Sequence, residues 1–165
     1  TLSLDIDESY PEGLSPEDTV RYIAKKKCDA AAALCAPDDL IITADTMVFL
    51  DNDRLGKPRD EEDALRMLRA LSGRGHTVCT GVSVRRGAQE ERFAVSTRVF
   101  FRPMTDDEIR AYIKTGEPMD KAGAYGVQSR GALIVERIDG DFFNVMGLPV
   151  EQLGLVLARF GVKLL

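Results

Sequence analysis

The chain has 165 residues, 44% of them hydrophobic, which is enough for one sizeable core and too short for two independent domains. Its net charge of −5 and the lack of a basic tail or stripe argue against a nucleic acid polymer as partner. The longest apolar runs cover only a few residues, far short of the ~20 that a membrane-spanning helix needs, so we expect no membrane partner.

The first half of the chain predicts a helix, a strand, a loop or hairpin, and a second helix. Ser15-Pro16-Glu17-Asp18 supplies an N-cap and a proline at the first helical position, followed by apolar residues at helical spacing as far as Leu34. Residues 40–50 are β-branched and apolar, which favours a strand. Residues 51–60 predict a loop or hairpin, and residues 61–71 predict a short amphipathic helix closed by Gly73.

The second half predicts a β-hairpin, a helix, a strand and a final helix. Residues 77–85 and 92–101 alternate in polarity around a turn at residues 86–88. Thr105 to Glu108 is a capping box that opens a helix ended by Gly116, residues 133–138 predict a strand, and residues 149–160 a helix. Together these elements predict an α/β fold, with a mixed twisted sheet flanked by helices, in a single domain over residues 1–165.

The three cysteines predict a reducing compartment. Cys28, Cys35 and Cys79 are odd in number and form no C-x-x-C pair, which argues against both a disulfide framework and a zinc site. We therefore expect reduced core thiols in a cytoplasmic protein.

One carboxylate lies where a strand should be apolar. Asp45 is in the middle of IITADTMVF, and burying an ionised acid is costly unless a cation or hydrogen-bond donors compensate. One interpretation is a strand-end acid that caps a neighbouring loop. The other, which we favour, is a functional acid that binds metal or orients water. In a regular strand Thr46 points to the opposite face.

Two loops carry lysines beside small or rigid residues. Lys57 in GKP suits a solvated turn unless other lysines converge on the same place. In DKAGAYGVQ, residues 120–128, small residues let the backbone approach a ligand, and Gln128 offers a donor and an acceptor to a base edge. A glycine-rich loop with a surface ion pair explains that stretch equally well.

Other polar and aromatic residues have simpler interpretations. Asn144 in GDFFNVMGLP favours a tight turn before the last helix. His76, the only histidine, has no serine or cysteine partner at a recognisable spacing, so we interpret it as structural. Phe142 and Phe143 are compatible with a homodimer, although two aromatics in a turn more often pack on their own core.

Several motifs follow one another in a characteristic order: ADT, GKP, LSGRGHTVCTGV, GEPMDKAGAYGVQ and GDFFNVMGLP. In this order, from about Asp7 to the C-terminal helix, the chain resembles the Maf-like nucleoside triphosphate pyrophosphatases. The resemblance implies cleavage of a nucleoside triphosphate between the α and β phosphates, with a divalent metal cation (Mg²⁺, Mn²⁺ or Co²⁺). It also implies two lobes around a cleft, as in the inosine triphosphate pyrophosphatases.

The resemblance further implies roles for individual residues. Because a triphosphate carries about four negative charges near neutral pH, an acidic protein must gather cations locally to hold it. Whether the catalytic acid binds metal or polarises the attacking water stays open. The matching positions are Asp45 as catalytic acid and metal ligand, Glu8 as metal ligand, Thr46 and Gln128 for substrate specificity, and Lys27, Lys57 and Lys121 for phosphate.

Thr46 and Gln128 favour one branch of this family. The pattern ADT with DKAG.Y..Q resembles the branch that acts on dTTP and UTP, including modified pyrimidine triphosphates. The 7-methyl-GTP branch typically has a different residue after the acid and an acidic residue in place of the glutamine. The alternatives are a 7-methyl-GTP pyrophosphatase and a non-catalytic, nucleotide-sensing regulator of septum formation, which would bind nucleotide without turnover.

One feature of the family pattern does not occur in the sequence. Family members begin with a strand and a Ser-rich loop with two adjacent arginines, which normally embraces the phosphates, whereas this sequence starts at Thr1 without them. Arg85 and Arg86 cannot substitute, because we expect them at the end of a hairpin strand, facing solvent. We favour omission of the N-terminal segment over a degenerate, weakly binding protein, because the matching polar positions would drift after loss of catalysis.

Overall fold

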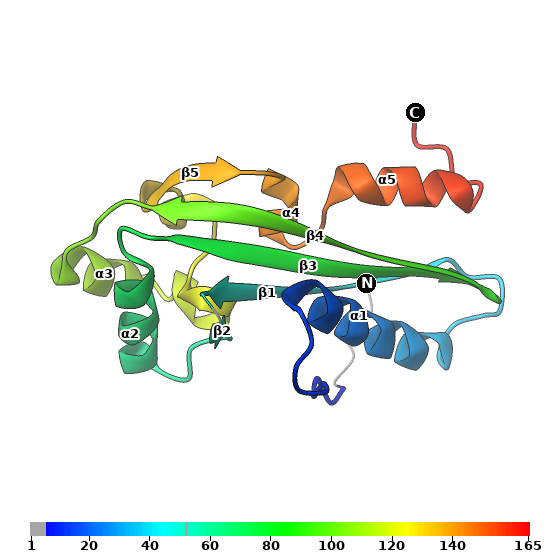
Figure 1. The fold of residues 1–165 in the computed structure, drawn as a ribbon, viewed down its shortest axis with the longest axis horizontal. Coiled ribbons are helices and arrows are strands. Elements are labelled where there is room, and N and C mark those ends of the chain that lie inside the picture. The colour runs from blue at the N-terminus through cyan, green and yellow to red at the C-terminus, as the bar shows by residue number, and fades with distance from the viewer. Residues whose placement is uncertain (1–5, 52) are drawn as a thin grey trace.

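The computed structural model describes residues 6–51 and 53–165, and it forms one long sheet with helices packed around it (Figure 1). The strands are β1 (Ile41–Leu50), β2 (Asp53–Leu55), β3 (Gly75–Arg86), β4 (Gln89–Phe101) and β5 (Val135–Asp139). The helices are α1 (Pro16–Ala32), α2 (Glu61–Leu71), α3 (Asp106–Ile113), α4 (Phe142–Met146) and α5 (Val150–Arg159). No helix in the described ranges is both long and apolar enough to cross a membrane.

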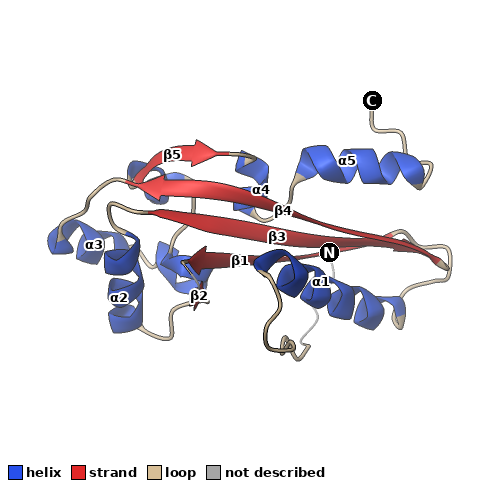
Figure 2. Ribbon diagram, viewed as in Figure 1, coloured by secondary structure: helices blue, strands red, loops and turns tan. Residues whose placement is uncertain are grey.

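The strand order is β2-β1-β3-β4-β5, and the long β3–β4 hairpin runs almost the length of the molecule (Figure 2). The predicted α/β class with flanking helices is confirmed. The sheet, expected to be mixed, is antiparallel at every pairing among the described strands. Because β2 pairs only with Val48 to Leu50, the remaining outer edge of β1 has no strand partner in the described part of the chain.

Side chains of β1 and β3 alternate between the two faces of the sheet. Met47 and Cys79 pack with α1 on one face, whereas Val82 and Val84 pack with α5 on the other. Asp45 and Thr46 are therefore on opposite faces, as the period of a strand requires. The sheet thus presents adjacent residues of one strand to two different surroundings.

Helix α1 lies unusually close to the sheet, above Gly81, the partner of Asp45 in the β1–β3 register. A Cβ atom built on Gly81 would lie 2.3 Å from the carbonyl carbon and oxygen of Val20 in α1. Real Cβ atoms do not approach backbone this closely, so only glycine lets the helix pack here.

The start of α1 is as predicted, but its end is not. Ser15 Oγ accepts the N–H of Asp18 at 3.1 Å, and Pro16 opens the helix. The helix ends at Ala32, so its predicted extension to Leu34 was wrong, and that side chain is 67% exposed. All three cysteines are free, and Cys35 is only half-buried, unlike the other two.

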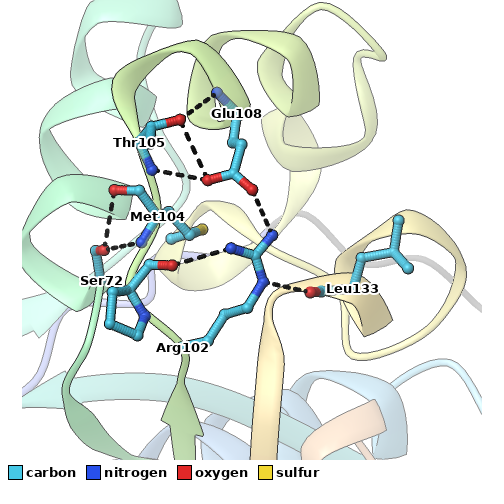
Figure 3. Close-up of polar contacts among 7 residues, drawn as sticks. Ser72, Arg102, Met104, Thr105, Glu108 and Leu133 are labelled. Carbon is cyan, nitrogen blue, oxygen red and sulfur yellow. Dashed lines mark hydrogen bonds and ion pairs between the residues drawn. The ribbon is translucent and has the colours of Figure 1, made fainter.

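A polar network fixes the junction of β4, α3 and the loop before β5 (Figure 3). Thr105 and Glu108 form the predicted capping box. Arg102 donates to Glu108 Oε1 at 2.8 Å and to the carbonyl of Leu133 at 3.0 Å. These bonds hold the segment just before β5 against the end of β4.

Three further expectations change in detail. Residues 129–133 form a 3₁₀ turn, so β5 begins at Val135 and not at residue 133. The turn predicted around Asn144 contains the short helix α4. Arg86 does not face solvent, because its Nη1 donates to the carbonyl of Phe160 at 2.8 Å, at the end of α5. Asn52 of the predicted hairpin lies outside the described residues.

Candidate functional site

Two hollows adjoin at the outer edge of β1. The first, of about 360 Å³, includes Glu8, Lys27 and Asp45 in its lining. The second, of about 480 Å³, includes Lys121 and Gln128. We call them the acid hollow and the recognition hollow. Three residues line both: Thr46, Lys57 and Ala122. All seven residues singled out by the motifs therefore line this double cleft, with Asp45 on one side of the strand and Gln128 on the other.

Asp45 is compensated by a cation from the overlying helix. It is 8% exposed, and its Oδ1 accepts a hydrogen bond from Lys27 Nζ of α1 at 2.7 Å. The same ammonium contacts Glu8 Oε1 at 2.9 Å. The loop-cap interpretation of Asp45 is wrong, since its partner is this lysine and not a loop. One ammonium thus gathers two carboxylates at the acid hollow.

Burial and charge act against each other in this pair. Burial raises the pKa of the Asp45 carboxyl, and the hydrogen bond and charge of Lys27 oppose that rise. Burial lowers the pKa of the Lys27 amine, but its hydrogen bonds to Asp45 and Glu8 outweigh burial, so the pKa lies above its usual value. Lys27 therefore stays charged over the range in which Asp45 titrates.

We expect Lys27→Met to lower the free energy of unfolding by about 1–3 kcal/mol at neutral pH, because a buried carboxylate loses its partner. Without the lysine the folded-state pKa of Asp45 stays above its unfolded value, so the folded state binds this proton more tightly. The loss should therefore shrink as the pH falls below that raised pKa. Denaturant titrations at neutral and mildly acidic pH measure both effects.

The matched control is the double variant Lys27→Met/Asp45→Asn, which removes the buried charge together with its partner. It should recover most of the lost stability and show no such pH dependence. A loss that is equal in both variants and at both pH values would show that Lys27 contributes through packing alone.

The acid hollow suits a divalent cation that is shared with a phosphate ligand. Asp45 Oδ2 is buried and has no hydrogen-bond partner among the described residues, and Glu8 is the second carboxylate. No group of three or more metal-ligating side chains occurs in the described ranges. Asp45 and Glu8 are the two carboxylates of this hollow, and Mg²⁺ often binds through one or two carboxylates together with substrate phosphates.

The lysines of the cleft differ in how they are held. Lys121 Nζ contacts Asp120 Oδ1 at 2.6 Å and the carbonyl of Glu117 at 3.0 Å. Lys57, at the junction of the two hollows, forms no ion pair with any other described residue. Lys57 is exposed in the loop after β2, as expected of a solvated turn lysine, and it also lines the double cleft shared by Lys27 and Lys121.

Glu117 organises the segment of residues 116–131, here called the recognition loop. Its carboxylate accepts the N–H of Arg130 at 3.2 Å and of Gly131 at 3.1 Å. Tyr112 donates to the same carboxylate at 3.0 Å and accepts the N–H of Gly126 at 3.1 Å. The loop that carries Gln128 is thus held by one acid of its own and by one phenol from α3.

Motif reasoning singled out neither Glu117 nor Arg54. Glu117 lies in the quoted GEP segment, where an acid directly after a helix-ending glycine was the available signal. Arg54, on β2, lines the acid hollow and lies over the Tyr10 ring at 5.3 Å. Its only signal was a basic residue close to GKP in the predicted hairpin.

His76 has the structural role expected of it. Its Nε2 lies 2.7 Å from the hydroxyl of Tyr125, and its ring packs edge-on against Phe101. Burial lowers the pKa of His76 to about 4. The neutral imidazole therefore supports Tyr125, which lines the recognition hollow.

A buried acid held by a lysine, beside a cleft with further cations, is an arrangement suited to phosphoryl chemistry. The family model for Maf-like proteins matches residues 1–160. The chain belongs to this Maf-like family, and the resemblance seen in its motifs is confirmed.

Curated relatives cover most of the chain. A dTTP/UTP pyrophosphatase of Bacillus velezensis is 49% identical over 157 residues, which make up 95% of this chain and 82% of that protein. One of a Geobacillus species is 48% identical over 160 residues, 97% of this chain and 86% of that protein. One of Dictyoglomus turgidum is 46% identical over 161 residues, 96% and 83% respectively.

Proposed function

We propose that this protein is a nucleoside triphosphate pyrophosphatase that hydrolyses dTTP, UTP and modified pyrimidine triphosphates to the monophosphate and pyrophosphate. The observation that carries the proposal is the convergence of all seven motif residues on the double cleft. The names of the three relatives support the choice of pyrimidine substrates.

In this proposal the phosphates occupy the acid hollow and the base occupies the recognition hollow. Lys27 and Lys57 then line the hollow that holds the polyanion, with Lys121 in the adjoining hollow, although the chain as a whole, with its net charge of −5, would repel it. Two of these lysines exchange their present carboxylate contacts partly for phosphate oxygens. Gln128, which is exposed at the mouth of the recognition hollow, offers its amide to the base edge.

Asp45 is the proposed catalytic residue. Its Oδ2, the oxygen that is not bonded to Lys27, accepts a proton from the water that attacks the α phosphorus. Lys27 favours the ionised form that this role requires. In the alternative role of Asp45 Oδ2, Asp45 and Glu8 would hold a divalent cation, which would neutralise charge on the phosphoryl oxygens.

A triphosphate panel tests the proposal. With Mg²⁺, Mn²⁺ or Co²⁺ we expect dTTP and UTP to give the monophosphate and pyrophosphate, identified by chromatography, and chelation to abolish turnover. Release of inorganic phosphate with a diphosphate product would contradict cleavage at the α phosphorus. Preference for 7-methyl-GTP would assign the chain to the other branch.

The alternative function, the cellular location and a homodimer are further proposals. A nucleotide-sensing regulator of septum formation predicts binding without turnover, so the same panel combined with a binding measurement separates it from the enzyme. The cytoplasm is the proposed location, in keeping with the free thiols. A homodimer would use the exposed Phe142 and Phe143, which are 41% and 52% exposed.

A further inference from the structure

A short chain of hydrogen bonds runs from the cleft into the core. Thr46 Oγ1 lies 2.9 Å from Thr80 Oγ1 on the neighbouring strand β3. Thr80 Oγ1 in turn donates to the carbonyl oxygen of Asn144, in α4, at 3.0 Å. Thr80 and Asn144 are both fully buried, whereas Thr46 lines both hollows. This series of hydrogen bonds therefore joins a cleft residue to two residues that no solvent reaches.

The direction of these bonds follows from counting protons. A threonine hydroxyl has one proton, and the carbonyl of Asn144 can only accept. If Thr80 donated to Thr46, its oxygen would face the carbonyl oxygen at 3.0 Å with no proton between them, which is repulsive in a buried setting. Thr80 therefore donates to Asn144, and Thr46 donates to Thr80.

The acceptor at the buried end of this chain is itself held in place. Asn144 Nδ2 donates to the carbonyl of Val78 at 3.1 Å and to Thr97 Oγ1 at 2.9 Å. The main-chain carbonyl of Asn144, which is the group that accepts from Thr80, also accepts the N–H of Gly147 at 3.0 Å. Because these bonds come from β3, β4 and α4, the carbonyl cannot turn away from Thr80 without breaking several of them.

We propose that Thr80 is a positioning residue that makes Thr46 a hydrogen-bond acceptor towards the cleft, selecting bases with an imino N–H. With its proton committed to Thr80, Thr46 Oγ1 has only lone pairs to offer a ligand. Uracil and thymine present a donor at N3, whereas cytosine presents an acceptor there. The inference rests on the proposed function and adds a physical basis for preferring UTP and dTTP over CTP.

The test compares UTP, CTP and 3-methyl-UTP as substrates of the wild type, Thr80→Val and Thr80→Ser. The wild type should prefer UTP over both others by about 10²-fold or more, since an acceptor facing an acceptor or a methyl group leaves polar groups unpaired. Thr80→Val frees the Thr46 proton to point into the cleft. It should raise the CTP/UTP ratio of kcat/KM about 10-fold, and Thr80→Ser should retain the wild-type ratio.

Two controls separate positioning from general damage. In a Thr46→Val background, Thr80→Val should leave the CTP/UTP ratio unchanged, because its effect passes through the Thr46 hydroxyl. Thermal unfolding of each variant reports the stability loss separately, and a purely structural role of Thr80 would lower turnover of UTP and CTP by the same factor. That equal loss would overturn the inference, as would hydrolysis of 3-methyl-UTP as fast as UTP.

The remaining outcomes show which group of the ligand donates to Thr46, and whether the inference or the proposed function fails. If 3′-deoxy-UTP is the poor substrate and 3-methyl-UTP a good one, Thr46 accepts from the sugar and the base assignment is overturned. A wild type that hydrolyses no triphosphate contradicts the proposed function instead. The inference is then decided by the affinities for UMP and CMP, measured by calorimetry: a preference for UMP that Thr80→Val removes supports it, and equal affinities overturn it.

Discussion

Asp45→Asn should lower kcat for dTTP hydrolysis by about 10²- to 10⁴-fold, the largest effect expected of any single change on activity. The amide has the shape of the carboxylate and its oxygen still accepts from Lys27, so the fold and the cleft stay as they are. What is lost is the basic Oδ2, which has no hydrogen-bond partner among the described residues. Steady-state kinetics on the purified variant measure the change.

Asp63→Asn is the matched control for this experiment. Asp63 is also buried, at 6% exposure, and also paired with cations, through Arg66 at 2.7 Å, but it lies on α2 and lines neither hollow. Its substitution should reduce stability and leave kcat within about 3-fold of the wild type. Turnover of Asp45→Asn at the wild-type rate would exclude Asp45 as the catalytic acid, whatever the control shows.

Gly81→Ala should lower the free energy of unfolding by about 3 kcal/mol or more, a large effect for a single added methyl group. The new Cβ would lie 2.3 Å from the backbone of Val20, and backbone cannot move aside as a flexible side chain does. Helix α1 must shift away from the sheet, which also withdraws Lys27 from Asp45. Chemical denaturation, with activity measured on the folded fraction, tests both consequences.

Gly154→Ala adds the same methyl group in a permissive place. Gly154 is inside α5, and a Cβ there meets only Leu164 Cδ1, at an ordinary 3.9 Å. Alanine should stabilise this helix by about 0.5–1 kcal/mol. If Gly81→Ala were as well tolerated, the close packing of α1 on β3 would be adjustable, contrary to what the contact implies.

Sequence patterns predicted most of the elements because each had a local cause. The Ser15 cap with Pro16, and the capping box of Thr105 and Glu108, mark helix starts through bonds within a few residues. Strand alternation placed Asp45 and Thr46 on opposite faces before any tertiary contact was known. Helix ends were less predictable, as the exposed Leu34 shows, because apolar spacing continues past the point where α1 stops.

The parts of the site that were missed depend on contacts distant in the chain. Asp45 was singled out by its place in an apolar strand and Lys27 through the family pattern, but their ion pair requires α1 to lie on β1, which residue spacing does not encode. Glu117 acts through main-chain groups at residues 130 and 131, and main-chain partners have no sequence signature. Thr80 is an unremarkable strand residue until β1, β3 and α4 are assembled around it.

The alternation of β1 also separates two traits on which selection can act. Asp45 and its lysine lie beneath α1, whereas Thr46 and Gln128 belong to the hollow on the opposite face. Under the proposed function, substitutions on the Thr46 face would change nucleotide preference while Asp45 and Lys27 on the other face stay unchanged. Such a division would allow new substrate preferences to arise without loss of the proposed catalytic groups.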